Sequence, residues 1–372
     1  KKRAAAISPE SELYHALLVL LLQLDGGALE PAVGSAALAL DRLSTYNRRT
    51  LDPISEKIYF YASWAHERAG KLGELRSSLL AYHRTACLHH NAAGQAVLLN
   101  SLLRNYLHHR LLDQADKLLA KASFPDGASN CQLARFLYYS GRIKALQLEY
   151  TEAHRCLLQA QRKAPTSKAL GFRLTVHKLG AIVQLLLGEI PERAVFRHPS
   201  SRGPMKPYLQ LVQAVRLGDL GAFRSAMEAH AKVFAADGNT ALIGRLRQNV
   251  IRAGLRNISL AYSRIPLAEV AQKLKLDRPE DMESIVAKAI RDGVIDATLD
   301  HSAAVLLSRG GADVYTTLEP QAAFHKRITF CLNVHNDAVR AMSYPPDSHK
   351  DELPDAETLK ERQREEQELV AE

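Results

Sequence analysis

Hydrophobic residues recur every three or four positions along most of the chain, which predicts a mainly helical protein. Near the beginning, one helical face is marked by Leu13, Leu17, Leu20, Leu21 and Leu24. Ser8 followed by Pro9 is a typical helix start ahead of that face. A second clear stripe lies in residues 240–262 and consists of Leu242, Leu246, Val250 and Ile258.

The central part of the chain repeats itself. In residues 136–165, Gly141, Ala153, Ala160 and Pro165 fall on the small and proline positions of a tetratricopeptide unit. Equivalent positions are Ala115 and Ala122 one unit earlier, Leu75 before that, and Phe223 in a later candidate. Spacings of 40 residues (75 to 115) and 38 residues (115 to 153) suit helix pairs that stack into a solenoid.

A break follows this array. Residues 188–207 contain four prolines in 20 positions and are predicted to form a long loop or linker.

Residues 262–317 predict a winged helix. Arg264 and Ile265 suit a short strand, and Pro266 opens a helix to about Lys275. After a turn at 276–279, a second helix runs to about Asp292, with Gly293 just beyond its end. Its expected buried residues are Met282, Ile285, Val286, Ala289 and Ile290. We predict two further strands, residues 294–299 and 311–317, around a wing at 301–310.

A long amphipathic helix over residues 318–345 follows, and Pro345-Pro346 stops it. Its apolar stripe lasts five turns and includes Cys331 and His335, which gives both a core or interface position. We predict that the early part of the stripe packs on the winged helix and that the later part contacts other proteins. The predicted interface residues are Phe324, Ile328, Leu332, Val339 and Met342.

Charge argues against DNA binding by the winged helix. The chain carries +9, but residues 350–372 hold four Lys/Arg and nine Asp/Glu, which leaves a basic body and an acidic tail. Residues 264–300 hold six Lys/Arg and eight Asp/Glu, and Glu280, Asp281 and Glu283 begin the second helix, where DNA readers meet phosphates. We therefore expect this unit to bind protein. The basic residues in 142–178 and at 245, 252 and 256 are expected to be solvated, with an acidic partner as second choice and nucleic acid as third.

The residues that chemistry would need are not arranged as known motifs require. His66-Glu67 lacks the second histidine of a zinc-protease helix, and no glycine-rich phosphate loop occurs. Cys87, His89 and His90 form the densest cluster, which we interpret as a core thiol beside surface imidazoles, with His90 near Cys87 on a helix. Four widely spaced cysteines favour buried, free thiols in a reducing compartment. Lys1 in place of Met indicates a portion of a longer chain, and the seven-residue apolar run from Ala16 is too short to span a membrane. We expect no catalytic residues, cofactor, metal or small-molecule ligand.

Helical repeats that run into a winged helix and a terminal helix are the layout of PCI-domain proteins. The chain closely resembles the lid subunits of the 26S proteasome within that family over about residues 57–345. The matching blocks are ARFLYYSGRIKALQLEYTEAHR, TVHKLGAIVQLLLGEIPER, LAEVAQKLKL, IVAKAIRDGVIDA and PQAAFHKRITFCLNVHN. Pro266 replaces a small hydroxyl residue, and residues 200–207 and 301–310 diverge.

The resemblance implies a division into N-terminal repeats (1–134), a PCI domain (135–317), a bundle helix (318–345) and an acidic tail (346–372). Within the PCI domain, helical repeats reach about residue 261. The resemblance also implies a non-catalytic scaffold of the cytoplasm and nucleus. Such a scaffold contacts other lid subunits through winged-helix strands and a bundle of terminal helices, and touches no membrane. The alternatives are a PCI subunit of a signalosome-like or translation-initiation complex and, less favoured, a nucleic-acid-binding winged-helix protein.

Overall fold

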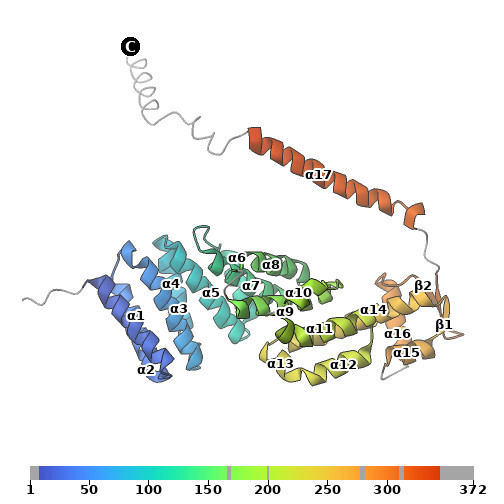
Figure 1. The fold of residues 1–372 in the computed structure, drawn as a ribbon, viewed down its shortest axis with the longest axis horizontal. Coiled ribbons are helices and arrows are strands. Elements are labelled where there is room, and N and C mark those ends of the chain that lie inside the picture. Colours follow the sequence, from blue (N-terminus) through green and yellow to red (C-terminus); the bar gives the residue numbers. More distant parts are fainter. Residues whose placement is uncertain (1–7, 166–168, 199–200, 277–280, 310–313, 344–372) are drawn as a thin grey trace, which may run out of the picture. The chain divides into compact units, whose positions relative to one another are not determined.

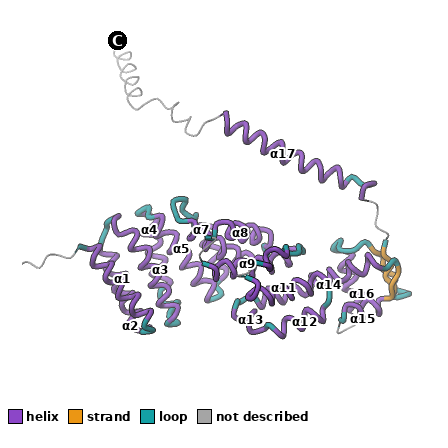
Figure 2. Tube along the Cα trace, viewed as in Figure 1, coloured by secondary structure: helices purple, strands orange, loops and turns teal. Residues whose placement is uncertain are grey.

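The structure is a computed structural model that describes residues 8–165, 169–198, 201–276, 281–309 and 314–343. It divides into two compact units, Lys1–Ser308 and Arg309–Glu372. The first unit contains helices α1 to α16 and a small sheet, and the second contains α17 (Figures 1 and 2). The mainly helical fold class is confirmed.

The first six helices pack around one hydrophobic core. They are α1 (Pro9–Asp25), α2 (Leu29–Thr45), α3 (Asp52–Arg68), α4 (Arg76–Leu88), α5 (Ala92–His108) and α6 (Leu112–Lys121). The Ser8 hydroxyl accepts a hydrogen bond from the Ser11 N–H at 3.2 Å, which confirms the predicted start of α1. The predicted face is buried at Leu13, Leu17, Leu20 and Leu24, while Leu21 is half-buried.

The clearest repeat unit is the pair α7 (Asn130–Leu146) and α8 (Tyr150–Lys163). Ala153 and Ala160 are fully buried, as their repeat positions predict. A Cβ on Gly141 would lie 3.0 Å from Leu157 Cγ and 3.3 Å from the Ala153 carbonyl oxygen. The small residues therefore let the two helices approach closely. The match weakens earlier, because Ala122 lies just beyond the end of α6 and Leu75 just before the start of α4.

The prediction of a loop or linker at residues 188–207 is wrong. Within it lie α10 (Arg193–Arg197) and the beginning of α11 (Arg202–Leu217). Pro204 falls in the first turn of α11, where a backbone N–H has no partner within the helix. Pro207 lies one turn further in and is buried, so packing of its ring accompanies the missing hydrogen bond. The four prolines therefore do not prevent helix formation in this segment.

The second core joins α8 and α9 (Leu170–Leu187) to α11, α12 (Leu220–Ala229), α13 (Ala231–Ala236) and α14 (Thr240–Ala261). α9 is long and apolar enough to cross a membrane by composition, but it packs against α8, α11 and α14 as a core helix. Lys178 of α9 pairs with Asp237 at 2.8 Å, and both side chains are largely buried. The Tyr208 hydroxyl of α11 donates to the same carboxylate at 2.8 Å. These bonds tie α9 and α11 to the turn before α14.

The predicted winged helix is present as β1 (Arg264–Pro266), α15 (Leu267–Leu274), α16 (Met282–Arg291), β2 (Ala297–Asp300) and β3 (Val305–Ser308). Its antiparallel sheet has the order β1-β3-β2. Gly293 has φ +68°, as its position after α16 predicts. Met282, Val286 and Ala289 are buried, while Ile285 and Ile290 are half-buried. The turn predicted at 276–279 lies mostly outside the described residues.

Two strand predictions need correction. The first of the two strands begins later than predicted, at Ala297, and the second lies in the segment predicted as the wing, at Val305–Ser308. Residues 314–316, placed in a strand by the sequence, form a short 3-10 helix, and 310–313 lie outside the described residues. Leu306 of this strand is buried in the core that the winged helix shares with the helices before it, and Val305, on the opposite face of the sheet, is also buried.

The second unit contains α17 (Glu319–Ser343), a single helix of 25 residues. The predicted long helix is thus confirmed, and its end agrees with the position of Pro345-Pro346. The acidic tail lies outside the described residues.

Candidate interaction surfaces

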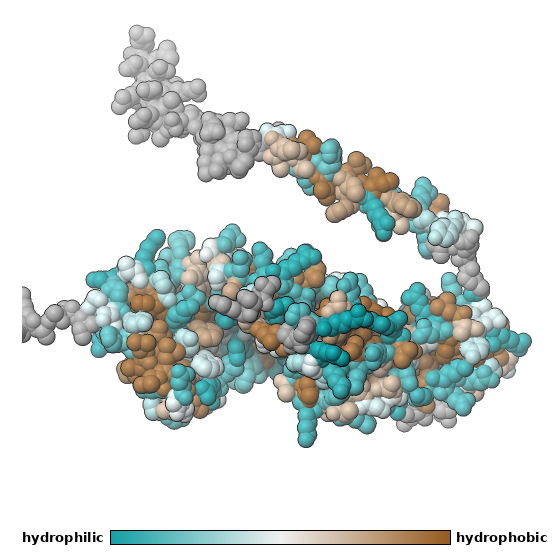
Figure 3. Space-filling view, viewed as in Figure 1, coloured by the Kyte–Doolittle hydropathy of each residue, from teal (hydrophilic) through white to brown (hydrophobic). Residues whose placement is uncertain are grey.

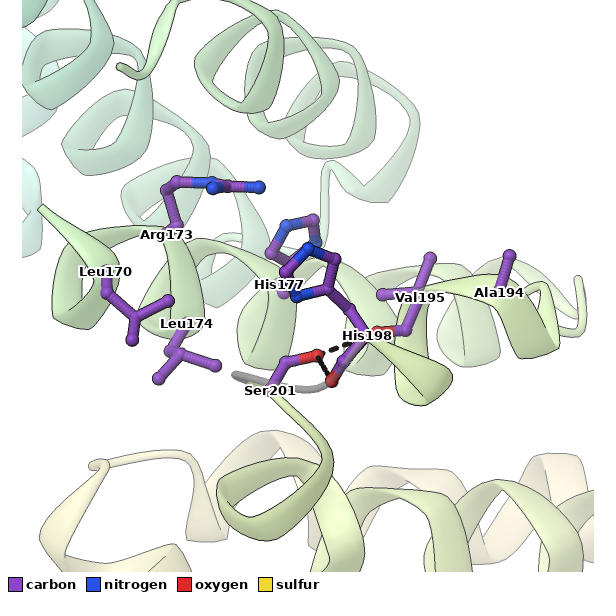
Figure 4. Close-up of a pocket in the computed structure, with 8 residues that line it drawn as sticks. All are labelled: Leu170, Arg173, Leu174, His177, Ala194, Val195, His198 and Ser201. Atoms are coloured by element: carbon purple, nitrogen blue, oxygen red, sulfur yellow. Dashed lines mark hydrogen bonds between the residues drawn. The ribbon is translucent and has the colours of Figure 1, made fainter. Parts of the chain in front are cut away.

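One cavity of about 200 Å³ gathers residue types that catalysis uses, between the beginning of α9 and α10 (Figure 4). It is lined by His177, His198, Ser201 and Arg173, together with apolar side chains. The Ser201 hydroxyl donates to the carbonyl oxygens of His198 (3.1 Å) and Val195 (3.2 Å), so it is engaged with backbone rather than with an imidazole. Among the described residues, no carboxylate lines the cavity. The Ser201 hydroxyl thus ties the beginning of α11 to α10, and the described side chains do not pair a nucleophile with a base.

The surroundings of His177 favour its neutral form. Burial is the main cause that lowers its pKa, and the nearby positive charges of Arg173 and His198 lower it further. A neutral imidazole can be buried where α9 meets α10 without the cost of burying a charge.

The cluster around Cys87 is arranged differently from the prediction. His90 lies beyond the end of α4 in a left-handed conformation, with φ 52°, so it is not beside Cys87 on a helix. The imidazole of His83, one turn earlier in α4, lies 3.9 Å from the Cys87 sulfur. Cys87 is exposed, and of the four cysteines only Cys156 is buried, so the prediction of buried thiols is wrong for three of them. Among the described residues, no group of His, Cys, Asp and Glu is arranged to hold a metal ion.

The winged helix presents acidic groups where a DNA reader presents cations. Asp281 precedes α16 and Glu283 lies in its first turn, while Glu280 is outside the described residues. The imidazole of His301, in the loop after β2, contacts Glu283 at 2.6 Å. Arg252 of α14 pairs with Asp292 at the other end of α16. The local charge therefore disfavours phosphate contacts, as the sequence predicted.

The sheet of the winged helix has two edge strands. β3 is the central strand and is paired on both sides, with β1 and with β2. β1 contains Pro266, which lacks a backbone N–H and so makes a poor template for a further strand. β2 has four residues without proline and pairs with β3 through all of them. Among the described strands, β2 offers the better edge for addition of a partner strand.

Apart from half-buried Pro320, every described side chain of α17 is solvent-exposed. The predicted interface residues are exposed by 63% (Phe324), 56% (Ile328), 55% (Leu332), 42% (Val339) and 76% (Met342). Phe330 and Val334, which the sequence analysis did not select, are exposed by 68% and 51%. At 3.6 residues per turn they lie roughly 140° around the helix from the middle of the predicted stripe. The helix thus carries two apolar stripes, and a count of residues on both faces would have found the second.

Another apolar surface lies at the end of the first unit formed by α1 and α2, where Figure 3 shows a cluster of hydrophobic atoms. The large hydrophobic side chains exposed on these two helices are Tyr14, Leu18, Val19 and Leu22 of α1 and Leu38 of α2. The leucine spacing in α1 predicted only its buried face, and this exposed face lies beside it.

Three family models match the chain. Residues 1–212 match the model of PSMD3-like N-terminal TPR repeats, and residues 227–309 match the PCI domain. Residues 313–372 match the model of the C-terminal part of a proteasome regulatory subunit. The PCI match ends within one residue of β3.

Curated relatives match over nearly the whole chain. It is 53% identical to the probable 26S proteasome non-ATPase regulatory subunit 3 of Nicotiana tabacum over 346 residues, which cover 92% of this chain and 71% of the relative. It is 51% identical to the Anopheles gambiae protein of that name over 374 residues, covering 100% of this chain and 75% of the relative. The Drosophila melanogaster protein of the same name is 50% identical, with 100% and 76% covered.

Proposed function

The chain belongs to the family of 26S proteasome non-ATPase regulatory subunit 3, and from this premise we propose that it is a non-catalytic scaffold of the regulatory-particle lid. In this role it supports ATP- and ubiquitin-dependent protein degradation by holding neighbouring subunits through protein–protein contacts. The family assignment favours the proteasome over the signalosome-like and translation-initiation alternatives. The acidic start of α16 disfavours the nucleic-acid alternative.

The observation that carries the proposal is that α17, within its own unit, buries none of its large apolar side chains. A helix of 25 residues with large apolar side chains on two faces gains little stability from its own hydrogen bonds in water. Burial of Phe324, Ile328, Leu332, Val339 and Met342 against partner helices would remove that apolar surface from water. Phe330 and Val334 supply a second contact face. We therefore propose that α17 packs with terminal helices of other lid subunits in a bundle.

The winged helix supplies a second type of contact. β2 is an edge strand without proline, and addition of a neighbouring subunit's strand would satisfy its outward backbone groups. Pairing at a strand edge fixes the direction and register of the partner strand, while a helix bundle buries a large apolar area between subunits. Together they suit a subunit that positions its neighbours.

We propose that the chain is divided into repeats (1–134), a PCI domain (135–317), a bundle helix (318–345) and an acidic tail (346–372). We propose residence in both cytoplasm and nucleus, which imaging of a fluorescently tagged chain would test.

The central experiment is affinity purification of a tagged chain from cells, followed by mass spectrometry of the proteins that it recovers. The test variant carries Leu332→Asp and Val339→Asp on the first stripe. The control carries Asn333→Asp and Asn336→Asp, which add the same charge on the polar side of α17. We expect the test variant to lose lid subunits and the control to keep them. Recovery of the complete lid with the test variant would contradict the bundle role.

A further inference from the structure

A basic concavity lies between α10 and α11, in the segment that the sequence analysis assigned to a linker. Its volume is about 710 Å³, and four cationic side chains line it: Arg193, Arg197, Arg202 and Lys206. Arg193 and Arg197 are four residues apart in α10, and Arg202 and Lys206 are four residues apart in α11. Each pair therefore lies on one face of its helix, and the two faces border the same space.

The four cations have no partner within the described part of the chain. All four side chains are exposed, and no salt bridge or side-chain hydrogen bond involves any of them there. Like charges four residues apart on a helix repel each other, so each pair costs stability in the free protein. An anionic ligand that contacts both pairs would offset that repulsion through its attraction to the four positive charges.

The concavity is built on fixed elements. Its floor consists of Phe196 and Met205, which are buried, and Leu209, which is half-buried. The Ser201 hydroxyl bonds to the carbonyl oxygens of Val195 and His198, and the Arg202 N–H bonds to the His198 carbonyl oxygen at 3.0 Å. These bonds join the beginning of α11 to the end of α10 and so help to fix the positions of the two cation pairs. The apolar floor keeps water from one side of the bound charge, which strengthens ionic contacts.

The arrangement points to the class of ligand. Arginine presents a planar fork of N–H groups that binds phosphate oxygens in pairs, and three of the four cations are arginine. They surround a compact space rather than follow a line, as binding along a nucleic-acid backbone would require. We propose that this concavity, the α10–α11 basic groove, binds a compact ligand that carries several phosphate groups. The phosphates could belong to a free polyphosphate or to a doubly phosphorylated peptide.

Titration calorimetry of the full chain with inorganic tripolyphosphate tests the proposal. The groove variant carries Arg197→Glu and Arg202→Glu, and the control carries Lys117→Glu and Lys121→Glu on the exposed side of α6. Circular dichroism and melting establish that each variant is folded. We expect saturable binding with one site per chain, weakened at least tenfold in the groove variant and unchanged in the control. Equal affinity in both variants would show attraction to net charge alone and overturn the proposal. If the groove variant does not fold, Arg197→Gln with Arg202→Gln replaces it under the same criteria.

Further titrations distinguish the source of the phosphate and the main competitor. Inositol hexakisphosphate represents a free polyphosphate, and a short peptide with two neighbouring phosphoserines represents a modified protein. Groove-dependent binding of either supports the site and identifies its source. A synthetic peptide of residues 350–372, the chain's own acidic tail, is the carboxylate comparison. If that peptide competes as well as tripolyphosphate at equal charge, the site recognises acidity rather than phosphate, and the proposal fails.

Discussion

Gly218 and Gly254 bring two helices into backbone contact. A Cβ on Gly218 would lie 2.4 Å from both the Cα and the nitrogen of Gly254, so neither position has room for a side chain. Gly218 ends α11 with φ +73°, a conformation that glycine adopts without strain. A Cβ on Gly254 would also lie 2.4 Å from Leu274 Cδ2, so the same contact seats α15 of the winged helix on α14.

Gly254→Ala should therefore destabilise the protein. The added methyl forces α11, α14 or α15 to shift, and overpacking of this kind costs about 1–3 kcal/mol. Gly244→Ala in the same helix is the control, because nothing lies within 4 Å of its added Cβ. The control should gain about 0.5–1 kcal/mol from helix propensity. Urea unfolding of both variants measures the difference, and equal stability would refute the close contact.

Ala153→Leu should destabilise the repeat core by about 1–3 kcal/mol, because Ala153 is fully buried where α8 meets α7. Gln159→Leu, an exposed position on α8, should change the free energy of unfolding little. Thermal unfolding of the two variants decides the matter. A melting temperature for Ala153→Leu equal to that of the natural chain would mean that the repeat register is misplaced.

The β2 edge should become protected on assembly. Amide hydrogen exchange of residues 297–300 should slow in the assembled complex relative to the free chain, because strand addition pairs the outward backbone groups. The central strand β3, already paired on both sides, is the internal comparison and should change less. Equal exchange of β2 in both states would argue against strand addition.

Removal of the end of α17 separates folding from assembly. A chain that stops before Asp337 loses Val339 and Met342 but keeps the first unit, which has its own cores. Circular dichroism should show the first unit folded, while native gels should show no entry into the lid. Wild-type stoichiometry in the lid would refute the bundle role. Unfolding of the truncated chain would instead place these residues in the core of their own chain.

Stability should fall as the pH drops below about 6.5, the ordinary pKa of histidine. Burial lowers the pKa of His177 in the folded state, so the unfolded chain binds its proton first and protonation favours unfolding. Above the unfolded pKa this cost is absent. His177→Gln should reduce the loss of stability between about pH 7 and pH 5.5, measured by urea unfolding at each pH. An unchanged pH dependence would show that His177 stays as accessible to protons in the folded chain as in the unfolded one.

Local sequence determined most of the helices, because their signals are local. Ser8 and Pro9 start α1, Pro266 precedes α15, and Gly293 follows α16, each through backbone preferences that need no distant partner. Ala153 and Ala160 predicted a closely packed helix pair, because small residues at these repeat positions allow the two helices to approach each other. The sequence also predicted α17, because apolar residues on one helix face recur with the same period whether that face is exposed or buried.

Tertiary structure decided what depends on partners far along the chain. Val305–Ser308 is the central strand, paired with β1 on one side and β2 on the other. The sequence of these four residues does not predict that position, because it depends on partners elsewhere in the chain. The proline-rich segment became α10 and α11 because the second core buries Phe196, Met205 and Pro207. That folding brought the cations of two helices around one concavity, and no spacing in the sequence showed the convergence. Sequence periodicity fixes which face of a helix is apolar, but only packing fixes what that face meets.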